Sequence, residues 1–422
     1  MDSEAPALMW DVLEEHLDEA EFLWGVWERS LVAPDYTLDE VAAGPEARLL
    51  AHVDGLVIGG PAVARKLLVP ALEEDEPGRV SAAALALLEG PGDAGLAAVV
   101  ELLREAPTQR PALTRALGCA QRGELRAQLR ALLTDDDVAV VAAAAEALAG
   151  RDEPIGDALG VLLMSDEPAA RALALRAIAD EPNPARHLRA LQAGLADPEV
   201  VDAAIASGVR LGVPAAWALA RARAQAGDEA SALWLALGGA PADQALLFAL
   251  LAAPETRAAA VWALGFVGTP AVVDACVEWL DDAVMGPLVG EAFTALTGVE
   301  LEAAKLTIDG PEVEALAHTP ADDLPRPDPM AVMQWWLQHR GRFIDGRRYL
   351  AGEPRALAAI VAAIERGPMR RRAGLVLDLQ LRCPPSTRPR VDVRAPTSRQ
   401  RADLATLADL RLTPLELECP LS

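Results

Sequence analysis

Apolar and polar positions along this chain form short helical blocks that repeat. Between about Pro77 and Val284, an Ala/Leu-rich block, a Gly or Pro break, a second apolar block and an acidic stop recur six or seven times, at a period of roughly 30 residues. Such a period is typical of a solenoid, in which each helix pair buries its apolar face against its neighbours. We therefore predict an all-α fold built around an α-solenoid of helix pairs.

The predicted first helices share small residues at the positions where neighbouring helices would meet. They are 79–87, 109–118, 140–149, 171–179, 201–208 and 257–265. The predicted second helices are 96–103, 125–133, 155–164, 188–195 and 272–280. An Ala-rich four-helix bundle is the alternative, but a bundle does not need so many helix pairs at a near-constant period.

Acidic residues end most of the second helices and often stand where the next helix begins. Examples are the stops at 134–137, 165–168, 196–199 and 281–282. An Asp or Ser at such a place can accept hydrogen bonds from free backbone N–H groups, and its negative charge suits the positive end of the helix dipole. We expect these residues to cap helices.

Outside the repeats, the pattern divides the chain into further parts. We predict a helical N-terminal cap over 1–77, the repeat solenoid over 78–300, a Pro-rich acidic linker over 301–329 and an Arg-rich, mostly helical C-terminal region over 330–422. Terminal units are usually atypical because they must cover the open core.

The formal net charge of −25 argues against nucleic acid as a partner, because phosphate binding needs a basic surface. The charge is uneven: residues 326–422 hold 17 Arg and 10 acidic residues, whereas the first 325 residues hold 21 basic and 53 acidic ones. The C-terminal part can therefore dock on the acidic body or face a different partner.

The remaining composition points to no metal site and no membrane. Cys119, Cys276, Cys383 and Cys419 lack C-x-x-C spacing, and the first two lie in repeat helices as small apolar residues. The chain shows neither a signal peptide nor a run of about 18 apolar residues. We expect a cytoplasmic protein without metal or cofactor.

The repeats resemble HEAT-like repeats, especially the short Arg/Ala-rich type of the phycobilisome lyase-like group. The matching residues are those of 257–265, 171–179 and similar runs. A bilin-lyase-like role would follow from this likeness alone, and fold analogy does not establish a function.

The ends carry a more specific resemblance, which covers nearly the whole chain. In order, the segments are 16–24, 49–56, 290–298, 323–329 with Trp335 and Trp336, and 347–352. Together they are similar to a family of uncharacterised proteobacterial HEAT-repeat proteins, often encoded beside type VI secretion components, effectors and spike-tip proteins. The resemblance implies an accessory, adaptor or chaperone role in secretion and carries over no catalytic residues.

The usual catalytic motifs are missing from the sequence. There is no H-E-x-x-H, no P-loop and no G-x-S-x-G, and the glycines of 55–60 lack the framing strand of a dinucleotide site. The best candidate is His16 with Asp18 and Glu19, together with His52 and Asp54, if the first two helices pack together. The same groups can equally cap helices and satisfy one another.

We therefore predict a non-enzymatic scaffold that binds a protein, which the resemblance implies is a type VI secretion effector or spike component. The predicted contacts are the exposed members of a set rich in Trp and Arg, since both are enriched in binding hot spots. The set is Trp10, Trp24, Trp27, Trp335, Trp336, Arg347 and Arg348. Trp335 and Trp336 cannot face the same side of a helix, so we expect one of them to pack inward and the other to meet the linker or a partner. The alternative is an enzyme or lyase-like factor that uses the His16/His52 region.

Overall fold

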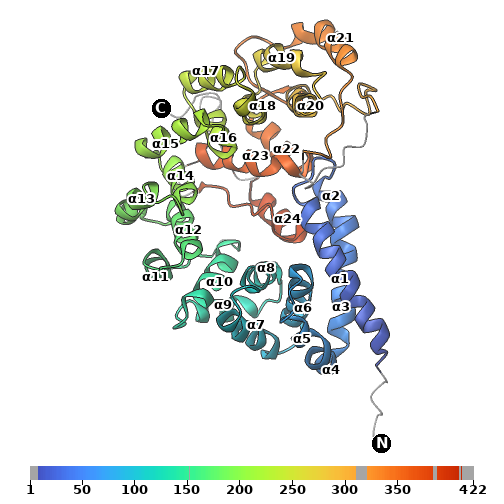
Figure 1. The fold of residues 1–422 in the computed structure, drawn as a ribbon, viewed down its shortest axis with the longest axis vertical. Helices are drawn as coiled ribbons and strands as arrows, with labels where there is room; N and C mark the ends of the chain where they lie inside the picture. The colour runs from blue at the N-terminus through green and yellow to red at the C-terminus, as the bar shows by residue number, and fades with distance from the viewer. Residues whose placement is uncertain (1–7, 152, 310–320, 384–386, 408–409, 411–422) are drawn as a thin grey trace, which may run out of the picture.

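The protein is an α-solenoid whose C-terminal region folds back along the repeats (Figure 1). This computed structural model describes residues 8–151, 153–309, 321–383, 387–407 and 410. Figure 1 shows the repeats curving around α22, α23 and α24, with the N-terminal helices beside them. The predicted all-α solenoid is confirmed. The strands of the described residues are limited to one antiparallel hairpin, β1 (Tyr349–Leu350) with β2 (Glu353–Pro354).

The N-terminal part packs two long helices against the first repeat. Leu17, Leu23 and Trp27 of α1 are buried against α3 and α6. Thr37 and Glu40 form a capping box at the start of α2, which satisfies free N–H groups from both sides. The elements are α1 (Trp10–Ser30), α2 (Leu38–Val41), the π-helical η1 (Ala42–Glu46), α3 (Ala47–Ile58), α4 (Gly60–Val63), the π-helical η2 (Ala64–Leu68) and α5 (Val69–Ala71).

Seven helix pairs and one further first helix follow in the described residues. The first helices are α6 (Pro77–Glu89), α8 (Arg110–Cys119), α10 (Val138–Ala149), α12 (Pro168–Ala177) with η3 (Ile178–Asp180), α14 (Val201–Arg210), α16 (Glu229–Gly238), α18 (Pro254–Val267) and α20 (Met285–Thr297). The second helices are α7 (Ala94–Glu105), α9 (Leu125–Leu132), α11 (Ala158–Leu163), α13 (Leu188–Leu195) preceded by η4 (Pro184–His187), α15 (Pro214–Gln225), α17 (Pro241–Leu250) and α19 (Pro270–Cys276) with η5 (Val277–Trp279).

The acidic stops cap α10 and α20, as predicted, whereas the stops before α12 and α14 make no side-chain cap and accept hydrogen bonds within their own turns. Asp137 accepts a hydrogen bond from the backbone N–H of Ala139 (2.8 Å), and Asp282 accepts one from that of Met285 (2.8 Å). In each turn the carboxylate satisfies N–H groups that lack helical partners. These acids therefore serve the solenoid's own geometry.

The first helices stack in sequence except at one point. Contacts run from α6 through α8, α10 and α12 to α14, and again from α16 through α18 to α20. Between α14 and α16, helix α15 packs against α16, and α23 (Met369–Arg382) contacts both first helices. The C-terminal region thus takes part in the solenoid where its own stacking is weakest.

Helices α15, α16 and α17 lie between residues 209 and 256, where the sequence pattern predicts no helix. The buried face of α15 consists of Ala216, Ala220 and Ala224, and its polar residues are two arginines and Gln225. An alanine-only face leaves a weak apolar period, so packing between repeats, rather than side-chain size, defines this helix.

The region predicted as a linker is held at the end of the solenoid where it is described. The backbone N–H of Asp328 donates to the carbonyl of Leu306 (2.7 Å), and Thr307 pairs with Pro327 in an isolated β-bridge. Leu301 is buried beside Gly290 of α20. Residues 310–320 lie outside the described residues.

The C-terminal region adds helices that cover two parts of the solenoid. Helix α21 (Pro329–His339) with η6 (Arg340–Arg342) packs on α19 and α20, in the position of the second helix that follows α20. Helices α22 (Leu357–Arg366), α23 and α24 (Thr397–Thr406) lie inside the curve (Figure 1). Cys119, Cys276 and Cys383 are buried, and Cys419 lies outside the described residues.

In the described part of the chain, no single helix combines the length and the apolar composition needed to cross a membrane. The bent pair 38–58 and 60–71, with 99° between its halves, passes both tests by length and composition only.

Candidate functional site: the arginine-lined contact of the C-terminal region

Three of the four C-terminal candidates contribute to the chain's own packing. Trp336 is buried, and its indole N–H donates to the carboxylate of Asp274 in α19 (2.8 Å). Trp335 is half-buried between Phe293 of α20 and the ring of His339. The expectation that one of the two tryptophans packs inward is confirmed. Arg348 is buried, whereas Arg347 is exposed.

The N-terminal tryptophans are also largely internal. Trp24 and Trp27 are buried and meet edge to face, with ring centroids 5.4 Å apart. Trp10 is half-buried, with the Lys66 ammonium 3.9 Å from its ring centroid. The hypothesis concerned the exposed members of the set, and Trp10, Trp335 and Arg347 are the members with accessible surface.

Arginines of the C-terminal region bind the carbonyl ends of successive first helices. The last carbonyls of a helix lack intrahelical partners and form the negative end of its dipole, so guanidinium groups suit them. We call this row of helix ends the carbonyl edge. The donor–acceptor pairs are Arg348 with Val267 (2.9 Å), Arg355 with Phe266 (2.9 Å), Arg371 with Gly265 (2.8 Å), Arg382 with Leu237 (2.9 Å), Arg388 with Ala179 (2.7 Å) and Arg210 (3.0 Å), Arg390 with Asp180 (3.1 Å), and Arg399 with Gly118 (2.8 Å).

The C-terminal region follows the carbonyl edge in reverse order. Its arginines meet α18 first, then α16, then α14 and α12, and finally α8. The backbone of the hairpin joins at the far end, where Tyr349 donates to Gly268 (2.7 Å) and Ala351 to Ala295 (2.8 Å). Of the two positions that the sequence left open for this region, the structure shows docking on the body.

A buried ion cluster anchors this contact at its centre. Asp378 of α23 is fully buried and pairs with Arg355 (2.5 Å) and Arg382 (3.0 Å). Burial opposes ionisation of this carboxyl, but the positive charges of Arg355, Arg382 and Arg348 lower its pKa to about 2. Burial also lowers the pKa of the Arg348 guanidinium well below its ordinary value.

The C-terminal region continues from the carbonyl edge to the N-terminal cap. The buried carboxylate of Glu46 accepts hydrogen bonds from the indole of Trp27 (2.9 Å), the backbone N–H of Thr397 (2.9 Å) and its hydroxyl (2.5 Å). Glu28 of α1 pairs with Arg115 of α8 and with Arg394. The backbone N–H of Met369 donates to Tyr36 (2.8 Å). The described parts of the N-terminal cap and the C-terminal region therefore meet.

The two candidate histidines lie together on the N-terminal helices. The Nδ1 atoms of His16 and His52 are 3.0 Å apart, so one ring donates a hydrogen bond to the other. Asp18 pairs instead with Arg79 (2.6 Å). Among the residues that the structure describes, no group of three or more His, Cys, Asp or Glu side chains could hold a metal ion. The two helices do pack together, and the two histidine rings hydrogen-bond to each other.

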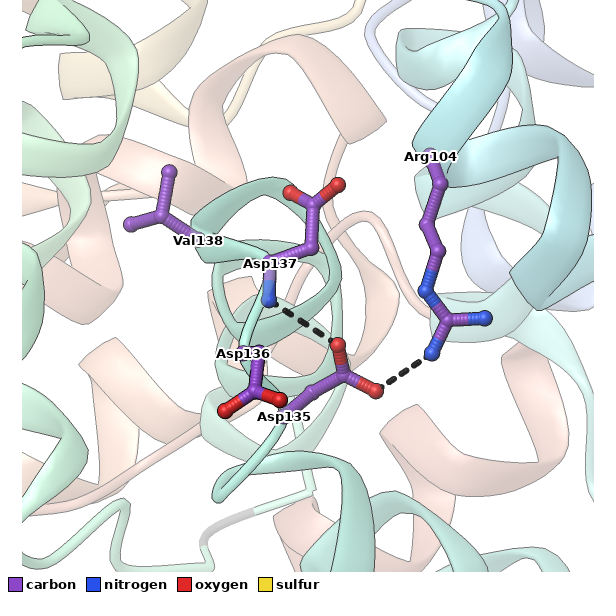
Figure 2. A pocket seen from close by; sticks show the side chains of 5 residues that line it. All are labelled: Arg104, Asp135, Asp136, Asp137 and Val138. Atoms are coloured by element: carbon purple, nitrogen blue, oxygen red, sulfur yellow. Dashed lines mark hydrogen bonds and ion pairs between the residues drawn. The ribbon is translucent and has the colours of Figure 1, made fainter.

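The acidic turn at 135–137 lines a shallow, open notch with Arg104 and Val138 (Figure 2). Asp135 accepts hydrogen bonds from the backbone N–H of Asp137 (3.0 Å) and from Arg104 (2.5 Å). These two donors lower the pKa of Asp135. Figure 2 shows the three carboxylates pointing in different directions. The notch is a helix-capping turn in which acidic groups stabilise the start of α10.

A second open depression lies between the second helices α17 and α19. Its lining includes Phe248, Leu251 and Trp279, with the Arg257 guanidinium 4.8 Å from the Trp279 ring centroid. Arg257 also donates to the carbonyl of Leu251 (2.8 Å). Arginine at this place in the first helix thus joins successive units, as Arg171 does at Ser165.

Exposed apolar side chains gather on α21, which the sequence analysis considered only for its tryptophans. Met330, Met333 and Leu337 are 75%, 39% and 73% exposed, and Ile344 beyond the helix is 60% exposed. The spacing i, i+3, i+7 places the three helical residues on one face. That spacing is visible in the sequence, but only the structure shows that these three side chains are exposed while Val332 and Trp336 are buried.

Searches against known proteins gave fold-level similarity alone. No family model and no curated protein matches the chain. A solved engineered protein is similar over 76% of this chain and 94% of its own (18% identity, TM-score 0.23). Human deoxyhypusine hydroxylase is similar over 65% and 94% (21% identity, TM-score 0.19). A chain in a structure of Kap95p binding to RanGDP is similar over 94% and 64% (12% identity, TM-score 0.29). At these TM-scores, the fold assignment rests on the helices themselves.

Proposed function

We propose that the protein is a non-enzymatic scaffold that binds another protein. The observation that supports this most directly is the carbonyl edge, where the solenoid already holds a polypeptide segment. Arg382, Arg388 and Arg399 contact different first helices, so the bound segment spans most of the repeat array. A surface of this length, built on rigid stacked helices, is what solenoids use for recognition.

The finer proposal is an adaptor or chaperone for a type VI secretion effector or spike component, acting in the cytoplasm. It is supported by the resemblance of the end segments, including 290–298 and 347–352. Their structural positions agree in one respect: both segments lie at the same end of the solenoid, where Gly352 donates to Leu296 (2.9 Å). These two segments thus share a contact, whereas segments 16–24 and 49–56 lie in the N-terminal helices α1 and α3.

The test is co-expression of the tagged chain with each effector and spike-tip protein encoded beside its gene. We expect at least one of them to co-elute with the chain in size-exclusion chromatography, at a fixed stoichiometry. If every neighbour elutes separately at micromolar concentration, the adaptor proposal is wrong.

The second candidate is an enzyme or lyase-like factor that uses the histidine pair, and the 3.0 Å contact between His16 and His52 favours it. Hydrogen-bond range is the first requirement for two groups that share a proton in catalysis. A His16→Gln/His52→Gln variant tests this in a genetic complementation assay. Loss of complementation with an unchanged melting temperature would support the enzyme, whereas full complementation would exclude it.

A further inference from the structure

The apolar face of α21 lies at the open end of the second-helix layer. Helices α17, α19 and α21 follow one another in Figure 1, and α21 is joined to α19 through Trp336 and Arg340, which both bind Asp274. Met330, Met333 and Leu337 are exposed on α21, whereas Val332 and Trp336 are buried. This stripe therefore occupies the place where the next helix of a longer solenoid would stack.

The stripe differs from the rest of the surface in charge. Helix α21 contains no Asp, Glu, Lys or Arg between Pro329 and His339, in a chain of net charge −25. Surface helices of soluble proteins normally face water with polar side chains, and an apolar patch rimmed by polar groups marks an interaction site. Methionine is well suited to such a site because its flexible side chain adapts to the partner.

The segment after α21 carries exposed charges, the arginines Arg342 and Arg347 and the carboxylate of Asp345. Arg342 and Arg347 follow α21 on either side of Ile344 and are exposed. Within the part of the chain that the structure describes, neither forms an ion pair, whereas the neighbouring Arg340 pairs with Asp274 and Asp345. Exposed guanidinium groups that form no ion pair favour acidic side chains on a partner that covers the stripe.

A second copy of the chain fits this surface less well than a partner helix. A stable dimer buries roughly 800 Å² on each partner, and four side chains supply on the order of a few hundred Å². Two copies would also bring like charges together at the rim, within molecules that each carry a charge of −25. A single amphipathic helix needs only a stripe of this width.

We propose that the stripe formed by Met330, Met333, Leu337 and Ile344 is a docking site for an acidic amphipathic helix of a partner protein. The helix would place apolar residues at i, i+3 or i+4, and i+7 on the stripe, and carboxylates beside Arg342 and Arg347. The proposal rests on the scaffold function and adds to it the place of contact and the chemistry of the partner segment.

The experiment measures binding of a fluorescein-labelled 18-residue helical peptide to the full chain by anisotropy. The peptide carries Leu at the stripe spacing and Glu at the flanking positions, and two matched peptides replace Glu by Lys or scramble the Leu spacing. We expect the acidic peptide to bind in the micromolar range and both matched peptides to bind at least tenfold more weakly.

Substitutions in the chain test which of its residues the peptide contacts. Met330→Ser/Met333→Ser/Leu337→Ser should weaken the acidic peptide at least tenfold, and Arg342→Glu/Arg347→Glu should reverse the preference between the Glu and Lys peptides. The matched control is Val161→Ser/Met164→Ser, which removes two exposed apolar side chains from α11 and should leave binding unchanged. Circular dichroism melting confirms that each variant is folded.

Several outcomes would overturn the proposal. They are no binding to the wild type, equal binding to the stripe variant, and sedimentation showing a dimer that the stripe variant abolishes. Peptide binding that occurs only after residues 311–319 are replaced by a Gly/Ser linker would assign the stripe to the chain itself.

If neighbouring gene products bind the wild type and the stripe variant equally, the scaffold function stands and this docking site does not. If the peptide binds but no neighbouring gene product does, the docking site stands and the proposed scaffold function does not.

Discussion

At the residue scale, arginine side chains make two different kinds of contact in this chain. Repeat arginines such as Arg171 join adjacent units through loop carbonyls and carboxylates, and C-terminal arginines such as Arg388 bind the carbonyl edge. The guanidinium fork is suited to both, because it presents five donors and stays charged when it is partly buried. Composition alone shows the excess of arginine but not this division.

Replacing Asp378 by Asn should be among the most destabilising single changes. The substitution leaves Arg355 and Arg382 buried without a carboxylate, which typically costs about 3–5 kcal/mol. The measurement is urea unfolding followed by circular dichroism. The control is Asp345→Asn, because the side chain of Asp345 is 85% exposed where it pairs with Arg340, and its loss should cost at most about 1 kcal/mol. Equal losses would contradict the buried cluster.

The same carboxyl predicts a pH dependence. Because the folded pKa of Asp378 is lowered from about 4 to about 2, its stabilising effect is present above pH 4 and is lost as the pH falls towards 2. The difference in melting temperature between the wild type and Asp378→Asn should therefore shrink between pH 4 and pH 2. A difference that stays constant from pH 6 to pH 2 would show that folding does not shift the pKa of Asp378, and would contradict the buried ion cluster.

At the element scale, two of the first helices end at a glycine that the backbone geometry requires. Helix α18 ends at Gly268 with a φ of +68°, and α20 ends at Gly298 with a φ of +73°. Glycine adopts this left-handed conformation at little cost, and it also lets a second backbone approach closely. The hairpin backbone does so, since a Cβ on Gly268 would lie 2.4 Å from the carbonyl oxygen of Tyr349.

Gly268→Ala should therefore lower the free energy of unfolding by more than the cost of placing an alanine in the left-handed backbone conformation. The left-handed backbone costs an alanine about 1–2 kcal/mol, and the contact with Tyr349 must also be relieved by moving the hairpin. The matched control is Gly346→Ala, where φ is +74° and no heavy atom lies within 4 Å of the added Cβ. Thermal unfolding compares the two, and equal losses would argue against a close approach at Gly268.

At the scale of the whole molecule, the C-terminal region joins the last repeats to the N-terminal cap. Helix α23 contacts α14 and α16, and α24 continues to η1 of the cap, where Glu46 binds Thr397 (Figure 1). Solenoids without such a brace interact only between neighbouring units. Here, contacts such as Glu28 with Arg394 join residues 366 positions apart, so the curvature of the repeats depends on both ends.

The variant Glu28→Ala/Glu46→Ala tests this brace. It removes the ion pair with Arg394 and the hydrogen bonds to Thr397, so residues 394–406 should exchange backbone amide hydrogens about tenfold faster or more. Hydrogen exchange with mass spectrometry measures this. Helix α23 should be unchanged, because the Asp378 cluster holds it independently. Unchanged exchange over 394–406 would mean that the cap does not hold this segment.

Sequence by itself determined the class of fold, the place of the repeats and the capping role of the acidic turns before α10 and α20, because period, breaks and caps are local properties of the chain. It also identified Trp335 and Trp336 as residues of opposite orientation. It did not predict α15, whose buried face is only alanine. Tertiary structure alone decided that the arginine-rich region binds the carbonyl edge and that Met330, Met333 and Leu337 face water. Both depend on contacts between residues far apart in the chain, and the side of a helix that is buried depends on what packs against it.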